Sequence, residues 1–232
     1  MKKFLYRLDA IGNLRCLLLP VLAAVLLLHA RISGQNVMFG LERAQIPGEI
    51  DYTALVRWLA MMTLPLLING FYISRCRRIE LFSILRFRKR ETWLMQMALG
   101  CIFITVCYAI LLALPLSFSH PVQVILSAWI LLTLNILLWT ELLLLLNMLF
   151  PKASWSGILC AAVICGTYVV GEQFPSISQW LPTTWGMYSR TDMVSADGVS
   201  VLFCTAANMG AIGIIGAIGA VALRYVKGRD YE

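Results

Sequence analysis

The stretch VQVILSAWILLTLNILLWTELLLLLNML, residues 122–149, decides the fold class of this chain. It contains 28 residues, of which only Glu141 is ionisable. A helix needs about 20 consecutive apolar residues to cross the hydrocarbon core of a bilayer. A helix that is apolar on every side has no face for water and is buried in a core or in lipid. We therefore predict a transmembrane helix over this stretch.

The rest of the chain has the composition of a membrane protein. Sixty per cent of its residues are hydrophobic, and the charged fraction of 13% is about half that of a soluble domain. The first apolar run resembles a signal peptide, but Leu28 stands where cleavage after Ala30 needs a small residue, so we expect this run to be retained. The sequence predicts an all-α integral membrane protein with a single transmembrane domain over residues 1–232. Its six predicted transmembrane helices are residues 14–30, 52–73, 93–116, 122–149, 156–174 and 201–225.

The distribution of lysine and arginine indicates how these spans are oriented. Cytosolic loops of membrane proteins carry an excess of both residues. Of the 19 in this chain, 15 lie in the terminal segments or in regions that would share their side of the membrane. The other four are Arg31, Arg43, Arg57 and Arg190. Both termini are therefore predicted to be cytosolic. The net charge of +7 then reflects topology, and we expect no nucleic acid partner.

The most basic loop is RCRRIELFSILRFRKRET, residues 75–92, between the second and third predicted spans. In a helix, Ile79, Leu81, Phe82 and Leu85 would fall within one arc. A loop that only fixes the orientation, in contact with anionic lipid, would explain the charge but not these apolar residues. A short amphipathic helix explains both features, either at the membrane surface or presented to a soluble partner.

Motifs of catalytic and nucleotide-binding sites do not occur in the sequence. It has no GxxxxGK[ST] phosphate-binding loop and no GxSxG nucleophile motif. The two histidines, His29 and His120, stand near the outer ends of predicted spans, where we expect interfacial polar residues rather than a metal or acid–base centre. No two of the seven cysteines have CxxC spacing, which argues against a zinc site. We expect a non-enzymatic protein without catalytic residues, cofactor or metal of its own.

Three ionisable residues fall within predicted spans, namely Arg57, Glu141 and Glu172. An uncompensated charge at the centre of a bilayer costs about 2.5–3.5 kcal/mol on insertion scales. We hypothesise that Arg57 and Glu172 pair near the outer face as a latch or gate, with separate snorkelling to the interface as the alternative. Glu141 should face the bundle interior or a partner subunit, or be protonated, and we favour a packing or interface role over a proton relay. The asparagines within spans are expected to form hydrogen bonds between helices. They are Asn69, Asn135, Asn147 and Asn208.

Small residues recur on one side of the last predicted span, with Gly210, Gly213 and Ala217 at its centre. Small residues four positions apart let another helix approach closely. This face is predicted to serve packing within the bundle, which is the commoner use, or association with a second subunit.

The chain resembles the type-2 permease subunits of ABC exporters, and among them the small subunits of peptide export or lantibiotic immunity, such as exporters of phenol-soluble modulins. The resemblance covers the whole chain as a pattern. It rests on RRIELFSILRFRKRETW at residues 77–93, LPTTWGMYSR at residues 181–190 and the basic tail with Arg229 and Asp230. It implies that the segment after the second span is a coupling helix that sits in a cleft of a separate P-loop ATPase. It also implies a short re-entrant or interfacial helix after the fifth span, near residues 171–188.

The same resemblance implies the partners and the cargo. ATP and Mg would bind to the ATPase, and a second six-span permease, either a copy or a paralogue, would complete the complex in a bacterial plasma membrane. The cargo is expected to be a peptide or another amphipathic molecule. Two alternatives remain: a membrane sensor or immunity protein that works without ATP and, as the weakest, an integral membrane enzyme. The residues expected to couple to the ATPase are Arg77, Arg78, Ile79, Glu80, Leu81, Phe82, Leu85 and Arg86.

Overall fold

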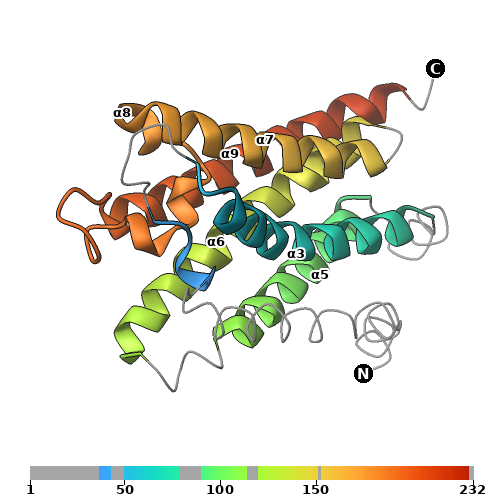
Figure 1. Ribbon diagram of the computed structural model, residues 1–232. Coiled ribbons are helices and arrows are strands. Elements are labelled where there is room, and N and C mark those ends of the chain that lie inside the picture. The colour runs from blue at the N-terminus through green and yellow to red at the C-terminus, as the bar shows by residue number, and fades with distance from the viewer. Residues whose placement is uncertain (1–36, 43–49, 79–89, 114–119, 151–152, 230–232) are drawn as a thin grey trace.

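Five long helices dominate the part of the chain that the structure describes (Figure 1). The computed structural model describes residues 37–42, 50–78, 90–113, 120–150 and 153–229. The long helices are α3 (Tyr52–Arg78), α5 (Arg90–Ala113), α6 (Val122–Leu149), α7 (Ala153–Gln173) and α9 (Val201–Arg229). Shorter helical segments are η1 (Val37–Phe39), α8 (Pro175–Ser178), η3 (Thr184–Gly186) and η4 (Tyr188–Arg190). The described residues are otherwise irregular, with one isolated bridge between Thr191 and Val199.

Each long helix is long and apolar enough to cross a membrane. Large apolar side chains such as Phe71, Phe103 and Ile158 are more than half exposed on the outside of the bundle, where a soluble protein places polar residues. The described part of the chain is therefore all-α, as predicted, and contains five candidate spans of a multi-pass membrane protein. The predicted span at residues 14–30 and the basic residues 79–89 lie outside the described residues. The candidate spans are Leu55–Arg77, Thr92–Ala113, Val122–Leu149, Trp155–Gln173 and Val201–Ala222.

Prolines explain where α6 and α7 end. The residue before a proline is pushed out of the helical region, because the proline ring clashes with its backbone. Phe150 precedes Pro151 and has φ −104° and ψ 135°, which ends α6. Phe174 precedes Pro175 and has φ −124° and ψ 79°, which ends α7. The observed bounds of α6 are those predicted from the apolar run.

The other helix bounds correct the sequence prediction at charged ends. Helix α3 continues past residue 73 to Arg78, α5 begins at Arg90 rather than residue 93, and α9 continues past residue 225 to Arg229. Hydropathy ends where charged residues begin, but arginine has a high helix propensity. A helix can therefore extend beyond the apolar part that marks it in the sequence. As a result, residues 75–78 of the basic stretch belong to α3.

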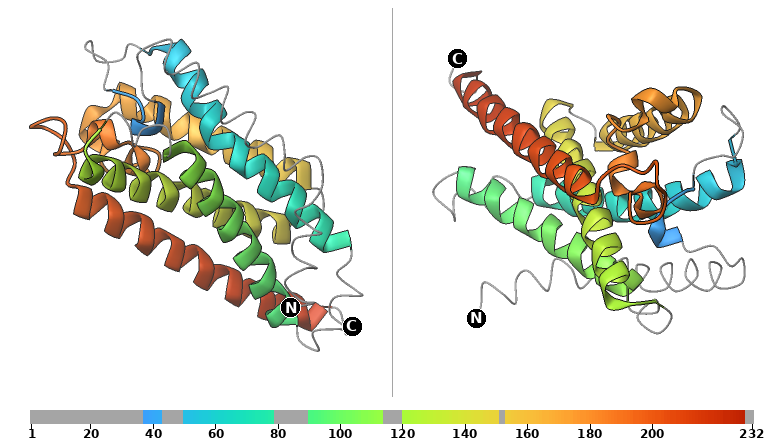
Figure 2. Two further views of the ribbon diagram at one scale, coloured as in Figure 1. Left: turned by 90° about the horizontal axis from the view of Figure 1, so that it is seen from below. Right: turned by 90° about the vertical axis from the view of Figure 1, so that its left-hand side faces the viewer.

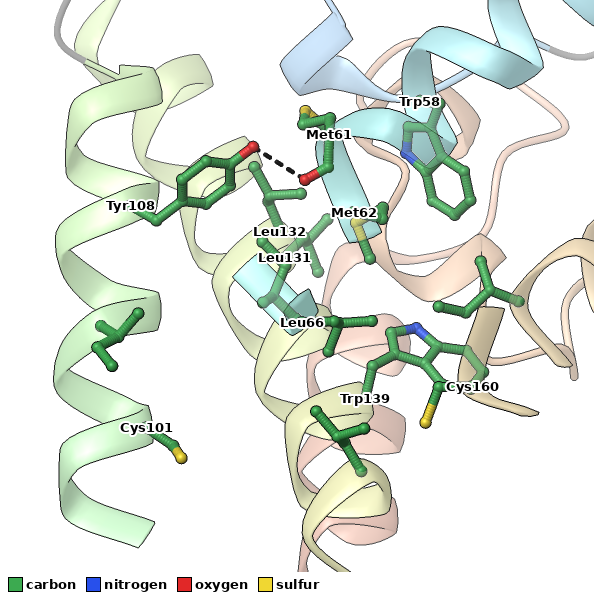
Figure 3. Close-up of a cluster of buried hydrophobic side chains, with 14 of the residues drawn as sticks. Trp58, Met61, Met62, Leu66, Cys101, Tyr108, Leu131, Leu132, Trp139 and Cys160 are labelled. Carbon is green, nitrogen blue, oxygen red and sulfur yellow. Dashed lines mark hydrogen bonds between the residues drawn. The ribbon is translucent and has the colours of Figure 1, made fainter. Parts of the chain in front are cut away.

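Helix α6 is the centre of the bundle. It packs against α3, α5, α7 and α9 and also contacts η1, η3 and η4, and Figure 2 shows it crossing between the other long helices. Of its apolar stretch, 56% is buried, compared with 11% for α9. The core that surrounds α6 draws side chains from four helices (Figure 3), and its labelled members are Trp58, Met61, Met62 and Leu66 of α3, Cys101 and Tyr108 of α5, Leu131, Leu132 and Trp139 of α6, and Cys160 of α7.

The bundle has two ends that matter for function. At one end, which we call the Arg77 end, α3 and α6 finish side by side. At the opposite end, which we call the Arg190 end, η1 lies against η4 and α3. The segment after α7, residues 174–200, gathers there, at the left of Figure 1. The two ends are joined through α6, because its C-terminus reaches the Arg77 end while η3 and η4 contact it from the other side.

Candidate functional site: polar contacts along α6

A buried ion pair joins the end of α7 to η4. The Arg190 guanidinium donates a hydrogen bond from Nη2 to Oε1 of Glu172, and the two side chains are only 6% and 2% exposed. Arg190 Nε also donates to the carbonyl of Leu41 at 2.9 Å, and its guanidinium carbon lies 5.5 Å from the centre of the Tyr168 ring. Burying a charge costs several kcal/mol unless partners replace its water. These contacts replace the lost water. Arg190 thereby joins Glu172 at the end of α7 and the backbone of Leu41 at the Arg190 end.

This arrangement changes the predicted latch. In the structure the partner of Glu172 is Arg190. From the sequence, Arg190 was predicted only to lie on the outer side, with no contact assigned to it. Arg57 is half-buried in α3, and its pairing with Glu172 stays a prediction. The sequence signal that could have found Arg190 is its place in the aromatic-rich stretch after the fifth predicted span, 18 residues after a glutamate that falls within that span.

Two buried asparagines hold the segment after α7 inside the bundle. Asn135 of α6 and Asn208 of α9 are fully buried, and Asn135 Nδ2 donates to Asn208 Oδ1 at 3.1 Å. Asn135 Nδ2 also donates to the carbonyl of Pro182 at 2.6 Å, and Asn208 Nδ2 donates to the carbonyl of Trp185 at 3.2 Å. Trp139 Nε1 completes the network by donating to Asn135 Oδ1 at 3.1 Å. Asn135 and Asn208, which the sequence marked as interhelical, therefore also bind backbone carbonyls of residues 182 and 185.

The close approach of η3 to α6 depends on a glycine. A β-carbon at Gly186 would lie 2.7 Å from Cβ of Asn135, which is too close for two carbon atoms that are not bonded. Asn135 stands near the middle of α6 (Val122–Leu149). Residues 182–187 thus reach well into the helix bundle instead of lying across its end.

A second polar cluster ties three helices together further along α6. Asn69 of α3 is fully buried, and its Nδ2 donates to Thr105 Oγ1 of α5 and to Thr140 Oγ1 of α6, each at 3.1 Å. Its Oδ1 has no hydrogen-bond partner among the described residues. The sequence marks Asn69 as a polar residue within a span, but it gives no signal for the two threonines, because threonine is common in membrane spans and the partners come from distant helices. Asn147, which the sequence marks in the same way, instead donates from Nδ2 to the carbonyl of Leu143 in its own helix, at 2.9 Å.

Glu141 follows Thr140 on α6 and is half-buried. Within the part of the chain that the structure describes, its carboxylate accepts no hydrogen bond and joins no ion pair. No three His, Cys, Asp or Glu side chains gather there as ligands for a metal ion. The packing or interface role that we favour for Glu141 over a proton relay therefore stays a prediction.

At the Arg77 end, α3 is fastened to the last turn of α6. Arg77 Nη1 donates to the carbonyl of Asn147 and lies 3.5 Å from the carbonyl of Phe150. The last four carbonyls of an α-helix have no partner within the helix, and a cation is favourable at this negative end of the helix dipole. Of the predicted coupling residues, Arg77 and Arg78 are the last two of α3. The others, Ile79, Glu80, Leu81, Phe82, Leu85 and Arg86, lie outside the described residues.

The small-residue face of α9 is open. Gly210, Gly213 and Ala217 are exposed, and a β-carbon added at Gly210 or Gly213 would have no atom within 4 Å. No described helix covers this face. Its predicted role in helix packing therefore does not involve the helices that the structure describes.

Comparison of this chain with models of protein families, with curated proteins and with solved structures gave no match.

Proposed function

We propose that this chain is the permease subunit of an ATP-driven ABC exporter, with six spans and both termini in the cytosol. The observation that carries the proposal is the position of the basic stretch. Helix α3 ends at Arg78 and α5 begins at Arg90, so residues 79–89 connect two candidate spans at the Arg77 end. The sequence of this connection combines arginines with an apolar arc, as a docking helix requires.

The energy source must be a separate protein, because the sequence contains no phosphate-binding loop. In the proposed complex, two ATPase subunits bind ATP and Mg below two permease subunits. Closure of the ATPases on ATP moves the docking segment, and this chain supplies the lever and the path for the cargo. Substitutions in this chain should then change how transport is coupled to hydrolysis rather than the chemistry of hydrolysis.

The segment after α7 is the proposed outer gate. Its short helices, α8, η3 and η4, correspond to the re-entrant or interfacial helix implied by the resemblance. In this arrangement the Glu172–Arg190 pair and the contact between Asn135 and Pro182 keep the segment in place, so an outward path would open only when these contacts break. An amphipathic peptide suits such a path, because it can enter from the lipid or from the cytosol. The open face of α9 around Gly213 is the surface that we assign to the second permease subunit.

The test is co-purification from native membranes. Tagged chain should bring down a P-loop ATPase. A variant with Leu81, Phe82 and Leu85 replaced by serine should lose it while staying in the membrane. A matched variant with Arg88 and Lys89 replaced by glutamine keeps the predicted coupling residues and should retain the ATPase. If the serine variant holds the ATPase with native affinity, the docking assignment is wrong. If the chain protects cells against a peptide although no ATPase binds to it, the alternative of an immunity protein would be favoured instead.

A further inference from the structure

The contact between Arg77 and α6 gives this arginine a role inside the bundle. Arg77 is half-buried, and its guanidinium is directed at the carbonyls of Asn147 and Phe150 at the end of α6. Pro151 prevents α6 from continuing, so these carbonyls stay available to an outside donor. A charge-assisted hydrogen bond of this kind is about twice as strong as a neutral one. The end of α3 is thereby fixed to the end of α6.

A second hydrogen bond connects the same two helices, further from the Arg77 end. Asn69 of α3 donates to Thr140 of α6, while Arg77 donates to Asn147. With a rise of 1.5 Å per residue, the two hydrogen bonds are about 12 Å apart along α3 and about 10 Å apart along α6. Hydrogen bonds at two positions along the helices oppose both sliding and pivoting of one helix on the other. Helices α3 and α6 should therefore move as one body.

The same α6 holds the proposed outer gate. Asn135, which binds the carbonyl of Pro182, lies about 18 Å along α6 from Asn147 by the same rise per residue. A displacement of the end of α3 would therefore be carried by α6 to residues 182–187. The route consists of hydrogen-bonded or packed residues throughout and requires no contact with the cargo.

We propose that Arg77 is a positioning residue that transmits movement from the end of α3 through α6 to residues 182–187, and that it does not itself bind the ATPase. The effect of Arg77 on transport rests on the proposed exporter function. The connection of Arg77 to residues 182–187 does not depend on the ATPase.

Hydrogen exchange of the purified chain in detergent tests the connection directly. In Arg77→Gln, the backbone amides of residues 183–187, which follow Pro182, should exchange several-fold faster than in the wild type. Arg224→Gln removes a positive charge from the same predicted side and should leave these amides unchanged. If Arg77→Gln does not fold, Arg77→Lys keeps the charge without the planar fork, and the same amides should exchange faster to a smaller degree. Faster exchange confined to the neighbourhood of residues 147–150 would overturn the proposal.

The complex provides the second measurement. Arg77→Gln should retain the ATPase and its ATP turnover but move several-fold less peptide per ATP hydrolysed. Loss of the ATPase in parallel with transport would make Arg77 a docking residue and overturn the proposal. If wild-type chain binds no ATPase, the exporter function fails, and the exchange experiment still decides whether Arg77 is connected to residues 182–187.

Discussion

The hydroxyl of Tyr108 in α5 donates a hydrogen bond to the backbone carbonyl of Met61 in α3, at 2.9 Å (Figure 3). Met61 lies four residues before Pro65, which stands inside α3. Proline has no N–H, so the carbonyl four residues earlier loses its partner within the helix. In lipid such a carbonyl has no water to turn to, and neighbouring helices must satisfy it. Tyr108 does so, and this explains how α3 accommodates its proline.

Tyr108→Phe should therefore destabilise the bundle. The expected loss is about 0.6–1.7 kcal/mol, from the average to the largest value that double-mutant cycles give for interhelical hydrogen bonds in a membrane protein. In a Pro65→Ala background, the new N–H can donate to Met61, so the effect of Tyr108→Phe should become smaller. Unfolding in mixed micelles measures all four members of this cycle. Tyr52→Phe is the matched control, because Tyr52 is 71% exposed. Equal losses in both backgrounds would contradict the role of Tyr108.

Breaking the ion pair at the Arg190 end should lower the stability of the bundle more than Tyr108→Phe does. Removing one partner of a buried pair leaves an unpaired charge and costs about 3–5 kcal/mol, so Glu172→Gln and Arg190→Gln should each lower stability strongly. The double variant should lose less than the sum of the two. Combining Glu172→Gln with Arg57→Gln gives the comparison that decides between the two arginines. We expect a larger coupling energy between Glu172 and Arg190 than between Glu172 and Arg57. A larger coupling energy between Glu172 and Arg57 would instead support the predicted latch.

Gly186→Ala tests the close contact between η3 and α6. Its new β-carbon would meet Asn135 at 2.7 Å and must push η3 away. Overpacking of this kind costs about 1–3 kcal/mol. Gly166→Ala makes the same change on α7 where nothing lies within 4 Å, and it should be neutral or slightly stabilising. Thermal unfolding of both variants checks the prediction, and equal behaviour would show that η3 does not press on α6.

Gly213→Leu should leave the stability of the single chain within about 0.5 kcal/mol, as expected for an exposed position. The exposed face around Gly213 gives the larger side chain room. If this face binds the second permease subunit, the same variant should lower the fraction of dimer. The mass of the protein in each nanodisc measures this fraction. A loss of stability as large as that of Gly186→Ala would instead show that another part of the chain packs on this face.

The sequence predicted the long helices well where apolar runs end at prolines. For α6 both bounds were correct, because Pro121 and Pro151 flank an uninterrupted apolar run. The ends of α3 and α9 were placed too early, because hydropathy stops at the first charged residues while the helix continues into them. Helix ends therefore need propensity and capping in addition to hydropathy.

The contacts of the candidate site were less accessible to sequence reasoning. That Pro65 frees the carbonyl of Met61 follows from the sequence, but the donor, Tyr108, comes from another helix and depends on how the helices pack. The same holds for Arg190, whose contact with Glu172 requires the chain to turn back after α7. Polar residues in spans can be recognised from the sequence, whereas their partners follow from the tertiary path of the chain.

The most direct test of the exporter function is ATP-dependent movement of a labelled amphipathic peptide by vesicles that contain the chain and its co-purifying ATPase. With the ATPase facing the outside solution, we expect peptide to accumulate in the lumen only with ATP and Mg. We also expect accumulation to stop when residues 80–85 are deleted, although the chain remains inserted. Accumulation that continues without ATP, or that the deletion leaves unchanged, would contradict the exporter function.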